Sequence, residues 1–283
     1  MTNSHIAVIG AGTMGNGIAQ ICAQAGLRIT MVDVNEAAVQ RGIDTVGKSL
    51  ARLVSKEKMT EADRTAALGR IQGSTDYAAI APADIVIEAA TENLDLKLRI
   101  LRQIDSLVRK EALIATNTSS ISISQLAAVV SRPERVIGMH FFNPVPMMAL
   151  LELIRGMQTS DEALRQAQAF AKTVGKTPIV VKNRPGFVVN RILCPMINEA
   201  IFALEEGLAS AEDIDTGMRL GCNHPIGPLA LADLIGLDTV LSVMNVFYEG
   251  FNDPKYRPAP MLKEMVAAGR LGRKTGRGFY DYT

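Results

Sequence analysis

Three glycines near the start of the chain have the spacing of a phosphate-binding turn. The hexamer Gly10-Ala11-Gly12-Thr13-Met14-Gly15 reads G-x-G-x-x-G, follows the apolar run His5–Ile9 and precedes a helical pattern. In such a strand–turn–helix, Gly10 permits the tight turn, Gly12 lets the backbone approach a pyrophosphate, and Gly15 lets the helix pack closely. The free N–H groups at the start of the helix then bind the phosphates. The alternative is an ordinary turn with chance glycines, which this context disfavours, so the whole hexamer predicts a dinucleotide site.

An acidic residue at the end of the next strand indicates which dinucleotide is bound. Asp33 directly follows the strand-like run at residues 28–32. A carboxylate there accepts hydrogen bonds from the adenosine ribose hydroxyls and repels a 2′-phosphate. The sequence therefore favours NAD over NADP as the cofactor.

A histidine suits proton transfer, because its ordinary pKa lies near neutral pH. The chain has His5 at the entry of the first strand, His224 before a proline in a turn, and His140 at the end of the strand-like run 136–139. Open α/β sheets build their sites at the carboxyl ends of strands. A structural role is commoner for a histidine taken without context, but His140 alone of the three has a position where such a sheet would build a site for proton transfer.

The elements that position these residues alternate between strand and helix. Short apolar runs typical of buried strands recur along the first half of the chain, with helical patterns between them. These runs are residues 5–9, 28–32, 85–87, 113–116 and 136–139, and the helical patterns include residues 15–25, 37–58 and a stretch after Thr60. The alternation predicts an α/β fold with a doubly wound, mostly parallel sheet of the Rossmann type.

The chain changes character at Pro185-Gly186, beyond which the patterns are helical. Helices are predicted at residues 188–206, 211–220, 228–248 and 261–269. Pro195 lies inside the first of them and should kink it or leave a carbonyl without its hydrogen bond. We expect a Rossmann-type NAD-binding domain over residues 1–183 and an all-helical C-terminal domain over residues 184–283.

The composition is that of a globular protein and excludes several classes of function. The formal net charge is +1, from 30 basic and 29 acidic residues, so no nucleic-acid partner is expected. No uncharged apolar run of about 18 residues is present, so no membrane span is expected. The first residues lead directly into a strand and leave no room for a signal peptide. The cysteines Cys22, Cys194 and Cys222 lack metal-ligand spacing, so no metal site is expected. Their odd number, without a secretory leader, indicates the reducing cytoplasm.

Longer motifs connect the chain with a known family. The segment Gly138-Met139-His140-Phe141-Phe142-Asn143-Pro144-Val145-Pro146 resembles the 3-hydroxyacyl-CoA dehydrogenase family, and the likeness is greatest to its single-function bacterial 3-hydroxybutyryl-CoA members. The resemblance covers almost the whole chain. Its other stretches are Asn117-Thr118-Ser119-Ser120, Pro185-Gly186-Phe187-Val188-Val189-Asn190-Arg191, Glu212-Asp213-Ile214-Asp215, Pro225-Ile226-Gly227-Pro228 and Lys274-Thr275-Gly276-Arg277-Gly278-Phe279-Tyr280.

The resemblance implies reversible NAD-dependent oxidation of an L-3-hydroxyacyl-CoA, with His140 moving the proton. It implies that Glu152 orients His140 and stabilises its protonated form, which agrees with the cost of burying an unpaired carboxylate in an apolar run. On sequence alone, Glu152 could instead face water from an edge strand.

The resemblance also assigns contacts to the substrate oxygen and to the cofactor. Ser119 and Asn190 are implied to donate hydrogen bonds to the reacting oxygen, which would put the site in the interdomain cleft. Without the resemblance, Ser119 would be read as a helix cap and Asn190 as helix-surface polarity. Further NAD contacts are implied at four positions, of which the two lysines are ordinary surface residues by sequence alone. These positions are Glu92, Lys97, Asn143 and Lys274.

A basic stripe carries the expectation of a CoA substrate. Ser49, Arg52 and Lys56 are spaced i, i+3 and i+7 and fall on one face of the predicted helix. A cationic stripe suits the phosphates of CoA, and the resemblance implies that Ser49 and Lys56 contact it. The alternative is a solvated, charged helix face.

Other functions on the same kind of fold remain open at this point. One is a dehydrogenase of a free hydroxy or sugar acid, which the basic stripe disfavours. Another is a non-catalytic protein that keeps a nucleotide fold, as certain lens crystallins do, and a third is a redox-sensing regulator. The likeness to the family further implies a preference for short acyl chains and a homodimer.

Overall fold

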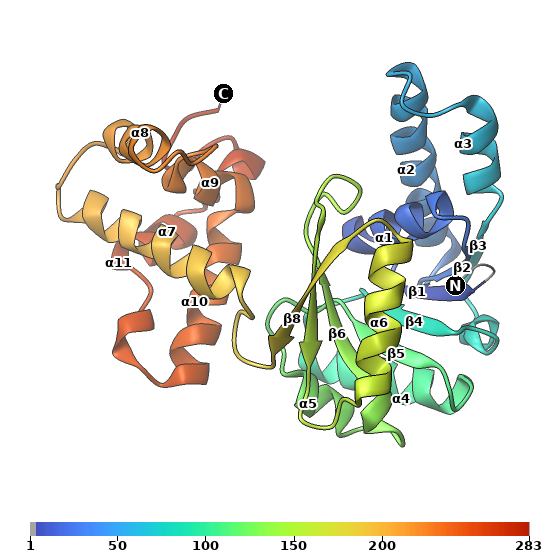
Figure 1. Ribbon diagram of the computed structural model, residues 1–283. Helices are drawn as coiled ribbons and strands as arrows, with labels where there is room; N and C mark the ends of the chain where they lie inside the picture. Colours follow the sequence, from blue (N-terminus) through green and yellow to red (C-terminus); the bar gives the residue numbers. More distant parts are fainter. Residues whose placement is uncertain (1–3, 283) are drawn as a thin grey trace. The chain divides into compact units, whose positions relative to one another are not determined.

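The structure is a computed structural model that describes residues 4–282. The chain divides into two compact units, Met1–Arg184 and Pro185–Thr283 (Figure 1). The division falls one residue beyond the expected boundary, at the Pro185-Gly186 turn beyond which the sequence predicts only helices.

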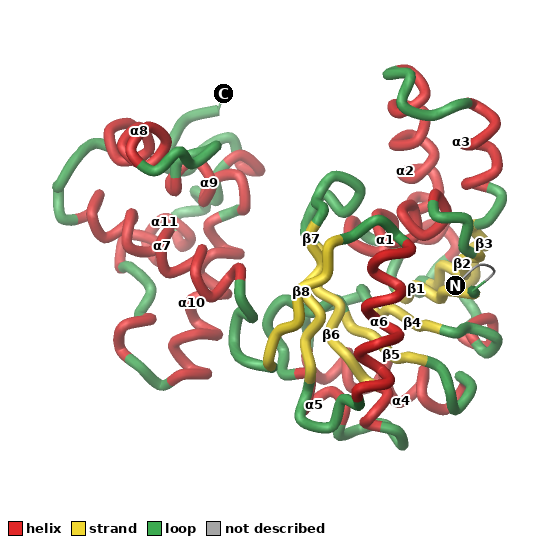
Figure 2. The backbone as a smooth tube through the Cα atoms, in the orientation of Figure 1, coloured by secondary structure: helices red, strands yellow, loops and turns green. Residues whose placement is uncertain are grey.

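The first unit is built around a sheet of eight strands. They are β1 (His5–Ile9), β2 (Arg28–Val32), β3 (Ile71–Ser74), β4 (Ile85–Glu88), β5 (Leu113–Thr116), β6 (Val136–Phe141), β7 (Leu150–Arg155) and β8 (Thr177–Lys182). Their order across the sheet is β3-β2-β1-β4-β5-β6-β7-β8, and every neighbouring pair is parallel except β6 and β7 (Figure 2). The doubly wound, mostly parallel sheet that the sequence predicts is therefore confirmed.

Six α-helices accompany this sheet. They are α1 (Thr13–Gln24), α2 (Glu36–Ser55), α3 (Glu61–Leu68), α4 (Leu94–Leu107), α5 (Ile123–Ala127) and α6 (Asp161–Thr173). Most of them begin at a side-chain cap, which satisfies an otherwise unpaired N–H group of the first turn. Asn35 caps α2 by accepting a hydrogen bond from Ala38 N, and Thr60 caps α3 in the same way. The predicted end of α2 at Lys58 is wrong, because Glu57 has a left-handed φ of 54° and the helix ends at Ser55.

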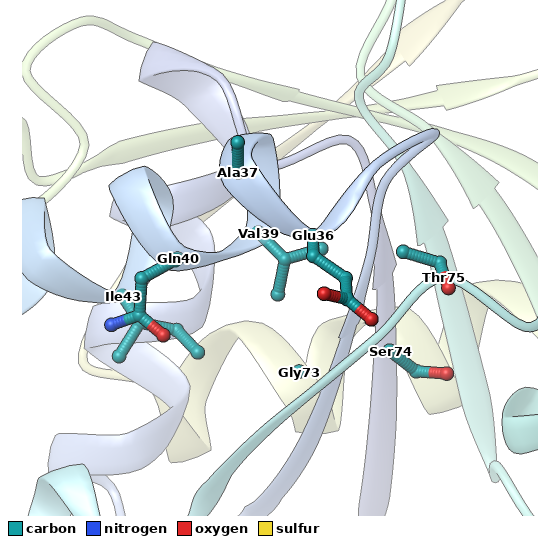
Figure 3. Close-up of a pocket in the computed structure, with 8 residues that line it drawn as sticks. All are labelled: Glu36, Ala37, Val39, Gln40, Ile43, Gly73, Ser74 and Thr75. Atoms are coloured by element: carbon teal, nitrogen blue, oxygen red, sulfur yellow. The ribbon is translucent and has the colours of Figure 1, made fainter.

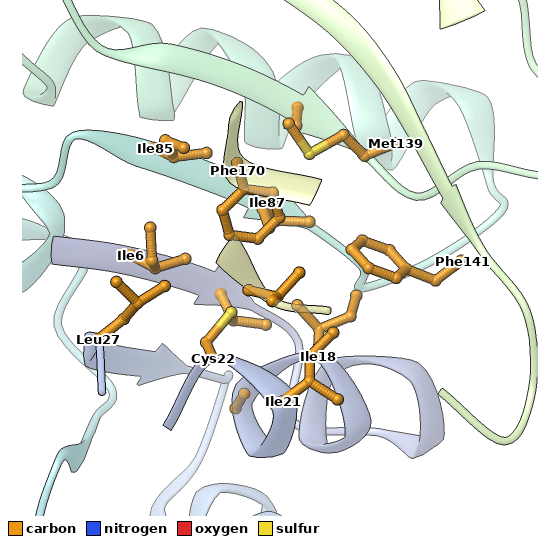
Figure 4. Close-up of a cluster of buried hydrophobic side chains, with 14 of the residues drawn as sticks. Ile6, Ile18, Ile21, Cys22, Leu27, Ile85, Ile87, Met139, Phe141 and Phe170 are labelled. Atoms are coloured by element: carbon orange, nitrogen blue, oxygen red, sulfur yellow. The ribbon is translucent and has the colours of Figure 1, made fainter. Parts of the chain in front are cut away.

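Residues from α1 and α6 fill the core against the strands. Figure 4 shows Ile18 and Cys22 of α1 and Phe170 of α6 packed among strand residues such as Ile87 and Phe141. All five are buried. A fully buried side chain of this size contributes about 1.5–3 kcal/mol. This core fixes the strand ends from which the candidate site is built. Burial also raises the pKa of the Cys22 thiol, consistent with the small buried hydrophobe expected there.

The second unit consists of helices, as predicted. Its α-helices are α7 (Val189–Glu205), α8 (Ala211–Gly221), α9 (Pro228–Ile235), α10 (Leu237–Phe251) and α11 (Pro260–Ala267). The helix α7 continues through Pro195. The single helix predicted at residues 228–248 is wrong, because Gly236 takes a φ of 102° and separates α9 from α10 with a bend of 99°.

Two buried carboxylates bind the C-terminal segment to the helices of the second unit. Asp215 accepts hydrogen bonds from Leu229 N and Ala230 N at the start of α9 and from the Tyr280 hydroxyl. Burial, and then the neighbouring Asp215 carboxylate, raise the pKa of Tyr280. Asp233 accepts bonds from the backbone N–H groups of Phe279 and Tyr280. These contacts give a structural role to the acidic and C-terminal motifs found in the sequence.

No single helix within residues 4–282 is both long and apolar enough to cross a membrane. The bent pair α9 and α10 meets the length and composition criteria only when the two helices are taken together.

Candidate active site

The glycine turn has the close approaches that a dinucleotide site requires. A Cβ added at Gly15 would lie 1.7 Å from Gly10 O, and one added at Gly10 would lie 2.7 Å from Ala89 O. These two glycines therefore let the start of α1 pack against the ends of β1 and β4. A Cβ at Gly12 would meet no protein atom within 4 Å. Gly12 therefore exposes its backbone, as the approach of a pyrophosphate requires.

Asp33 is attached to this turn by its carboxylate. One oxygen accepts a hydrogen bond from Ala11 N at 2.7 Å, and the other accepts one from Val34 N at 2.7 Å. These bonds fix the turn, and they hold the Asp33 carboxylate at the carboxyl end of β2. A pocket of about 460 Å³ adjoins it, lined among others by Gly10, Tyr77 and Leu96. The turn, the acid and the pocket together fit the adenosine half of NAD.

A larger pocket of about 690 Å³ lies between the first turns of α2 and the end of β3 (Figure 3). Its walls include Glu36, Gln40 and Ser74, and Figure 3 shows the Glu36 side chain extending from α2 toward the end of β3. None of the residues that line it is among the predicted site residues, so the size of a cavity does not locate the site in this unit.

His140 and Glu152 lie against each other, in the arrangement that the resemblance implies for an acid–base pair. They are register partners in the antiparallel β6–β7 pair, and His140 Nδ1 lies 2.7 Å from Glu152 Oε2. Glu152 is 0% exposed and His140 is 6% exposed. A carboxylate only accepts hydrogen bonds, so with Glu152 as carboxylate Nδ1 is the donor of this bond, which leaves Nε2 as the ring nitrogen that can exchange a proton with a ligand. The water-facing alternative for Glu152 is therefore wrong.

The side-chain amide of Asn117 connects the end of β5 to the end of β6, and the sequence did not single out this residue as part of the site. Asn117 Oδ1 accepts a hydrogen bond from Phe141 N at 2.9 Å. The bond joins the residue after β5 to the residue after His140. Its signal in the sequence was the Asn117-Thr118-Ser119-Ser120 motif, one of the stretches that carry the resemblance to the family.

Glu92 and Ser119 contact each other directly. Glu92 Oε1 accepts hydrogen bonds from Ser119 N at 2.6 Å and from Ser119 Oγ at 3.0 Å. Its other oxygen accepts a bond from the Thr118 hydroxyl at 2.7 Å. The residue assigned to the cofactor and the residue assigned to the substrate oxygen thus form one hydrogen-bonded unit after β4 and β5.

Lys97 is not the surface lysine that its sequence context indicates. It is 1% exposed, and its ammonium group forms an ion pair with Glu88, which ends β4. The Thr116 hydroxyl donates to the same carboxylate at 2.7 Å, and Ala90 N donates to the other Glu88 oxygen at 2.9 Å. The cation offsets the cost of a carboxylate buried under the dinucleotide turn. The glutamate that ends the buried run IVIE was the available signal, because it needs a cation nearby.

Comparison with known proteins places the chain in a family. Residues 5–184 match the NAD-binding domain of 3-hydroxyacyl-CoA dehydrogenase, and residues 186–282 match the C-terminal domain of that enzyme. The chain belongs to the 3-hydroxyacyl-CoA dehydrogenase family. The resemblance inferred from the motifs is confirmed, and so are the oxidoreductase class and the NAD-binding domain.

Individual members of the 3-hydroxyacyl-CoA dehydrogenase family match over the full chain. The chain is 51% identical over 282 residues to a probable 3-hydroxybutyryl-CoA dehydrogenase of Bacillus subtilis (strain 168), covering 100% of this chain and 98% of that protein. It is 50% identical over 277 residues to the 3-hydroxybutyryl-CoA dehydrogenase of Bradyrhizobium diazoefficiens, covering 98% and 94%. The crystal structure of (S)-3-hydroxybutyryl-CoA dehydrogenase PaaH1 from Ralstonia eutropha is similar with a TM-score of 0.98 and 66% identity, covering 99% of each chain.

Three further predicted site residues lie in the loop after β6 and in the second unit. Asn143 is exposed in the loop between β6 and β7. Asn190 lies in the first turn of α7, and Lys274 forms an ion pair with Asp238, both in the second unit. Their assignments to the cofactor and the substrate oxygen stay predictions.

The basic stripe lies on the last turns of α2. Ser49 is half-buried, whereas Arg52 and Lys56 are exposed. Lys56 is the C-cap residue of α2, so its backbone leaves the helix at that point. The stripe therefore presents two cations to solvent, and its role in binding CoA stays a prediction.

Proposed function

We propose that this chain catalyses the reversible NAD-dependent oxidation of L-3-hydroxybutyryl-CoA to acetoacetyl-CoA. The observation that carries the proposal is the buried His140–Glu152 pair, near the carboxyl end of β6 in a sheet whose glycine turn fits NAD. Near-full-length likeness to proteins named 3-hydroxybutyryl-CoA dehydrogenase supports the substrate.

His140 acts as the general acid and base in this proposal. In the oxidation, its Nε2 accepts the proton of the 3-hydroxyl group as the C3–H bond breaks, and bound NAD⁺ supplies the acceptor for the hydride. The imidazolium that forms keeps its Nδ1–H bond to Glu152, whose buried negative charge stabilises it. In the reduction, the same imidazolium returns the proton to the ketone oxygen.

Ser119 and Asn190 stabilise the charge that develops on the substrate oxygen. The Ser119 hydroxyl donates to Glu92 in this structure, at 3.0 Å. It must rotate to donate to the substrate, while the bond from Ser119 N to Glu92 keeps its backbone in place. Glu92 thus keeps Ser119 in place and contacts the cofactor ribose.

The proposal extends to the setting in which the enzyme works. It acts as a cytoplasmic homodimer, without nucleic-acid or membrane partners. Large apolar side chains exposed on the second unit support a contact with a second copy, among them Ile192 at 67%, Leu220 at 81% and Leu234 at 53% exposure. The balanced charge of the chain supports the absence of a nucleic-acid partner.

An absorbance assay of NADH oxidation tests the function. The purified enzyme is given acetoacetyl-CoA with NADH or NADPH, and then longer 3-ketoacyl-CoA esters and free 3-keto acids. We expect the fastest turnover with acetoacetyl-CoA and NADH, and little with free acids. If no 3-ketoacyl-CoA supports NADH oxidation, the proposal is wrong, and turnover only of free acids would favour the hydroxy-acid alternative.

A further inference from the structure

The loop at residues 142–149 joins the two strands that carry the acid–base pair. It runs from β6, which contains His140, to β7, which contains Glu152, and it includes Asn143. Most of its residues are exposed, and the backbone bonds within it converge on one carbonyl, that of Pro144. Contacts from outside the loop must therefore fix its conformation.

Lys176 supplies one of these contacts. It lies in the turn between α6 and β8, it is 7% exposed, and its ammonium group donates to Val145 O and Met148 O, each at 2.6 Å. Burial lowers the pKa of Lys176. A buried ammonium costs free energy that an apolar side chain of equal length would not, so packing alone does not explain a lysine here.

The second contact runs from the same loop to the dinucleotide helix. The Val145 side chain is 2% exposed and lies against α1, where a Cβ added at Gly17 would come within 2.8 Å of Val145 Cβ. The loop therefore contacts α1 through the Val145 side chain, and it contacts Lys176 through the Val145 carbonyl group. These two attachments connect the helix that begins at the glycine turn with the hairpin that carries the acid–base pair.

We propose that Lys176 is a positioning residue for the reaction. It holds the loop at residues 142–149 against α1, so that Asn143 and the His140–Glu152 pair keep a fixed place relative to the glycine turn. This inference rests on the proposed function, because its effect is on the alignment of the proton carrier with the bound cofactor. A misplacement of about 1 Å can cost about a hundredfold in rate.

Replacement of the ammonium group tests the proposal. Lys176→Met keeps the apolar stem and removes the donors, and Lys176→Arg restores two donors. Lys172→Met, an exposed lysine on the preceding helix α6, is the matched control. We expect Lys176→Met to lower kcat with acetoacetyl-CoA by about tenfold to a hundredfold and to raise KM for NADH. Lys176→Arg should recover part of the loss, and Lys172→Met should equal the wild type.

The rates are measured at a temperature well below the Tm of each variant, so that a merely structural role leaves kcat and KM unchanged. Unchanged kinetics with a lowered Tm would overturn the proposal. If Lys176→Met does not fold, Gly17→Ala displaces Val145 from the other side, and the proposal then requires the same changes in kcat and KM. A wild type without activity would refute the proposed function, whereas an active wild type with an unaffected Lys176→Met refutes only the role of Lys176.

Discussion

His140 and Glu152 are direct register partners in the antiparallel β6–β7 pair, and their side chains meet at 2.7 Å. Opposite residues of an antiparallel pair project to the same face of the sheet, so the ladder itself brings the two groups together. The neighbouring strands β5 and β8 continue the sheet on both sides. The pair is therefore held by sheet hydrogen bonds on elements that resist local movement.

Loss of either partner should reduce turnover. We expect His140→Gln to lower kcat with acetoacetyl-CoA and NADH by about 10²-fold to 10⁴-fold, because it removes the proton carrier. Glu152→Gln should cost less, about tenfold to a hundredfold, because the imidazole remains but loses the carboxylate that stabilises its charged form. Steady-state kinetics at saturating substrate measure both. NADH binding by fluorescence serves as the control and should stay close to the wild type. A His140→Gln variant that keeps more than half of the wild-type kcat would exclude the assigned role.

The glycines of the turn should respond differently to the same small substitution. Gly15→Ala should lower the free energy of unfolding by about 1–3 kcal/mol, because its Cβ would collide with Gly10 O at 1.7 Å. Gly12→Ala should fold normally but bind NADH about tenfold or more weakly, because the methyl group meets no protein atom and blocks only the ligand. Gly47→Ala, in open space inside α2, is the control and should stabilise by about 0.5–1 kcal/mol. Urea unfolding and NADH titration separate the two effects, and equal NADH affinity in Gly12→Ala would contradict the assignment.

The sequence predicts those parts of the fold whose signal is local. The strands β1, β2 and β5 are predicted with their observed bounds, because each is a short apolar run between polar turns. The edge strands β3 and β8 were not predicted. They contain exposed or half-buried residues, including Gly73 and Pro178, and they become strands by pairing with a neighbour that is already buried.

The candidate site divides in the same way. The glycine turn and Asp33 were predicted from position and residue type, and His140 from its position together with the family motif. The burial of Lys97 was not predicted, because it depends on Glu88 and Thr116. These two residues come from two different strands and meet α4 only in the folded chain. The buried run that ends at Glu88 indicates that a cation is needed there, but composition and periodicity do not say which residue supplies it.

Removing one partner of the buried Glu88–Lys97 ion pair should lower the free energy of unfolding more than removing both. Lys97→Met should lower the free energy of unfolding by about 3–5 kcal/mol, because it leaves the Glu88 carboxylate buried without its cation. The double variant Glu88→Gln/Lys97→Met should recover part of that loss, since no uncompensated charge remains. Arg102→Gln, an exposed change on the same helix α4, should have no effect. Urea unfolding measures all three. Wild-type stability in Lys97→Met, together with a raised KM for NADH, would instead favour direct contact with the cofactor.

His5 should make the stability depend on pH. Burial, and then the charge of Arg28, lower the pKa of His5 below its ordinary value of 6.5, and its ring nitrogen lies 2.8 Å from the Thr30 hydroxyl. As pH falls below 6.5, the unfolded chain binds a proton at His5 while the folded chain does not, so the free energy of unfolding decreases. His5→Gln should flatten this decrease between pH 7.5 and 5, to be measured by urea unfolding at each pH. If wild type and variant lose stability in parallel over that range, His5 is not the source.

The CoA assignment predicts a change in KM that depends on the phosphates of the substrate. Lys56→Gln should raise KM for acetoacetyl-CoA about two- to fivefold at low salt and leave kcat unchanged, because an exposed ion pair contributes about 0.2–1 kcal/mol. The increase should shrink as salt is added, since exposed charges are screened. Acetoacetyl-pantetheine, which lacks the nucleotide phosphates, should give the same KM with wild type and variant. Lys110→Gln removes an equal charge from an exposed lysine in the turn before β5, outside the stripe on α2, and should leave every KM unchanged. If Lys56→Gln and Lys110→Gln behave alike toward acetoacetyl-CoA, the stripe on α2 is a solvated helix face, and CoA must be bound by other residues.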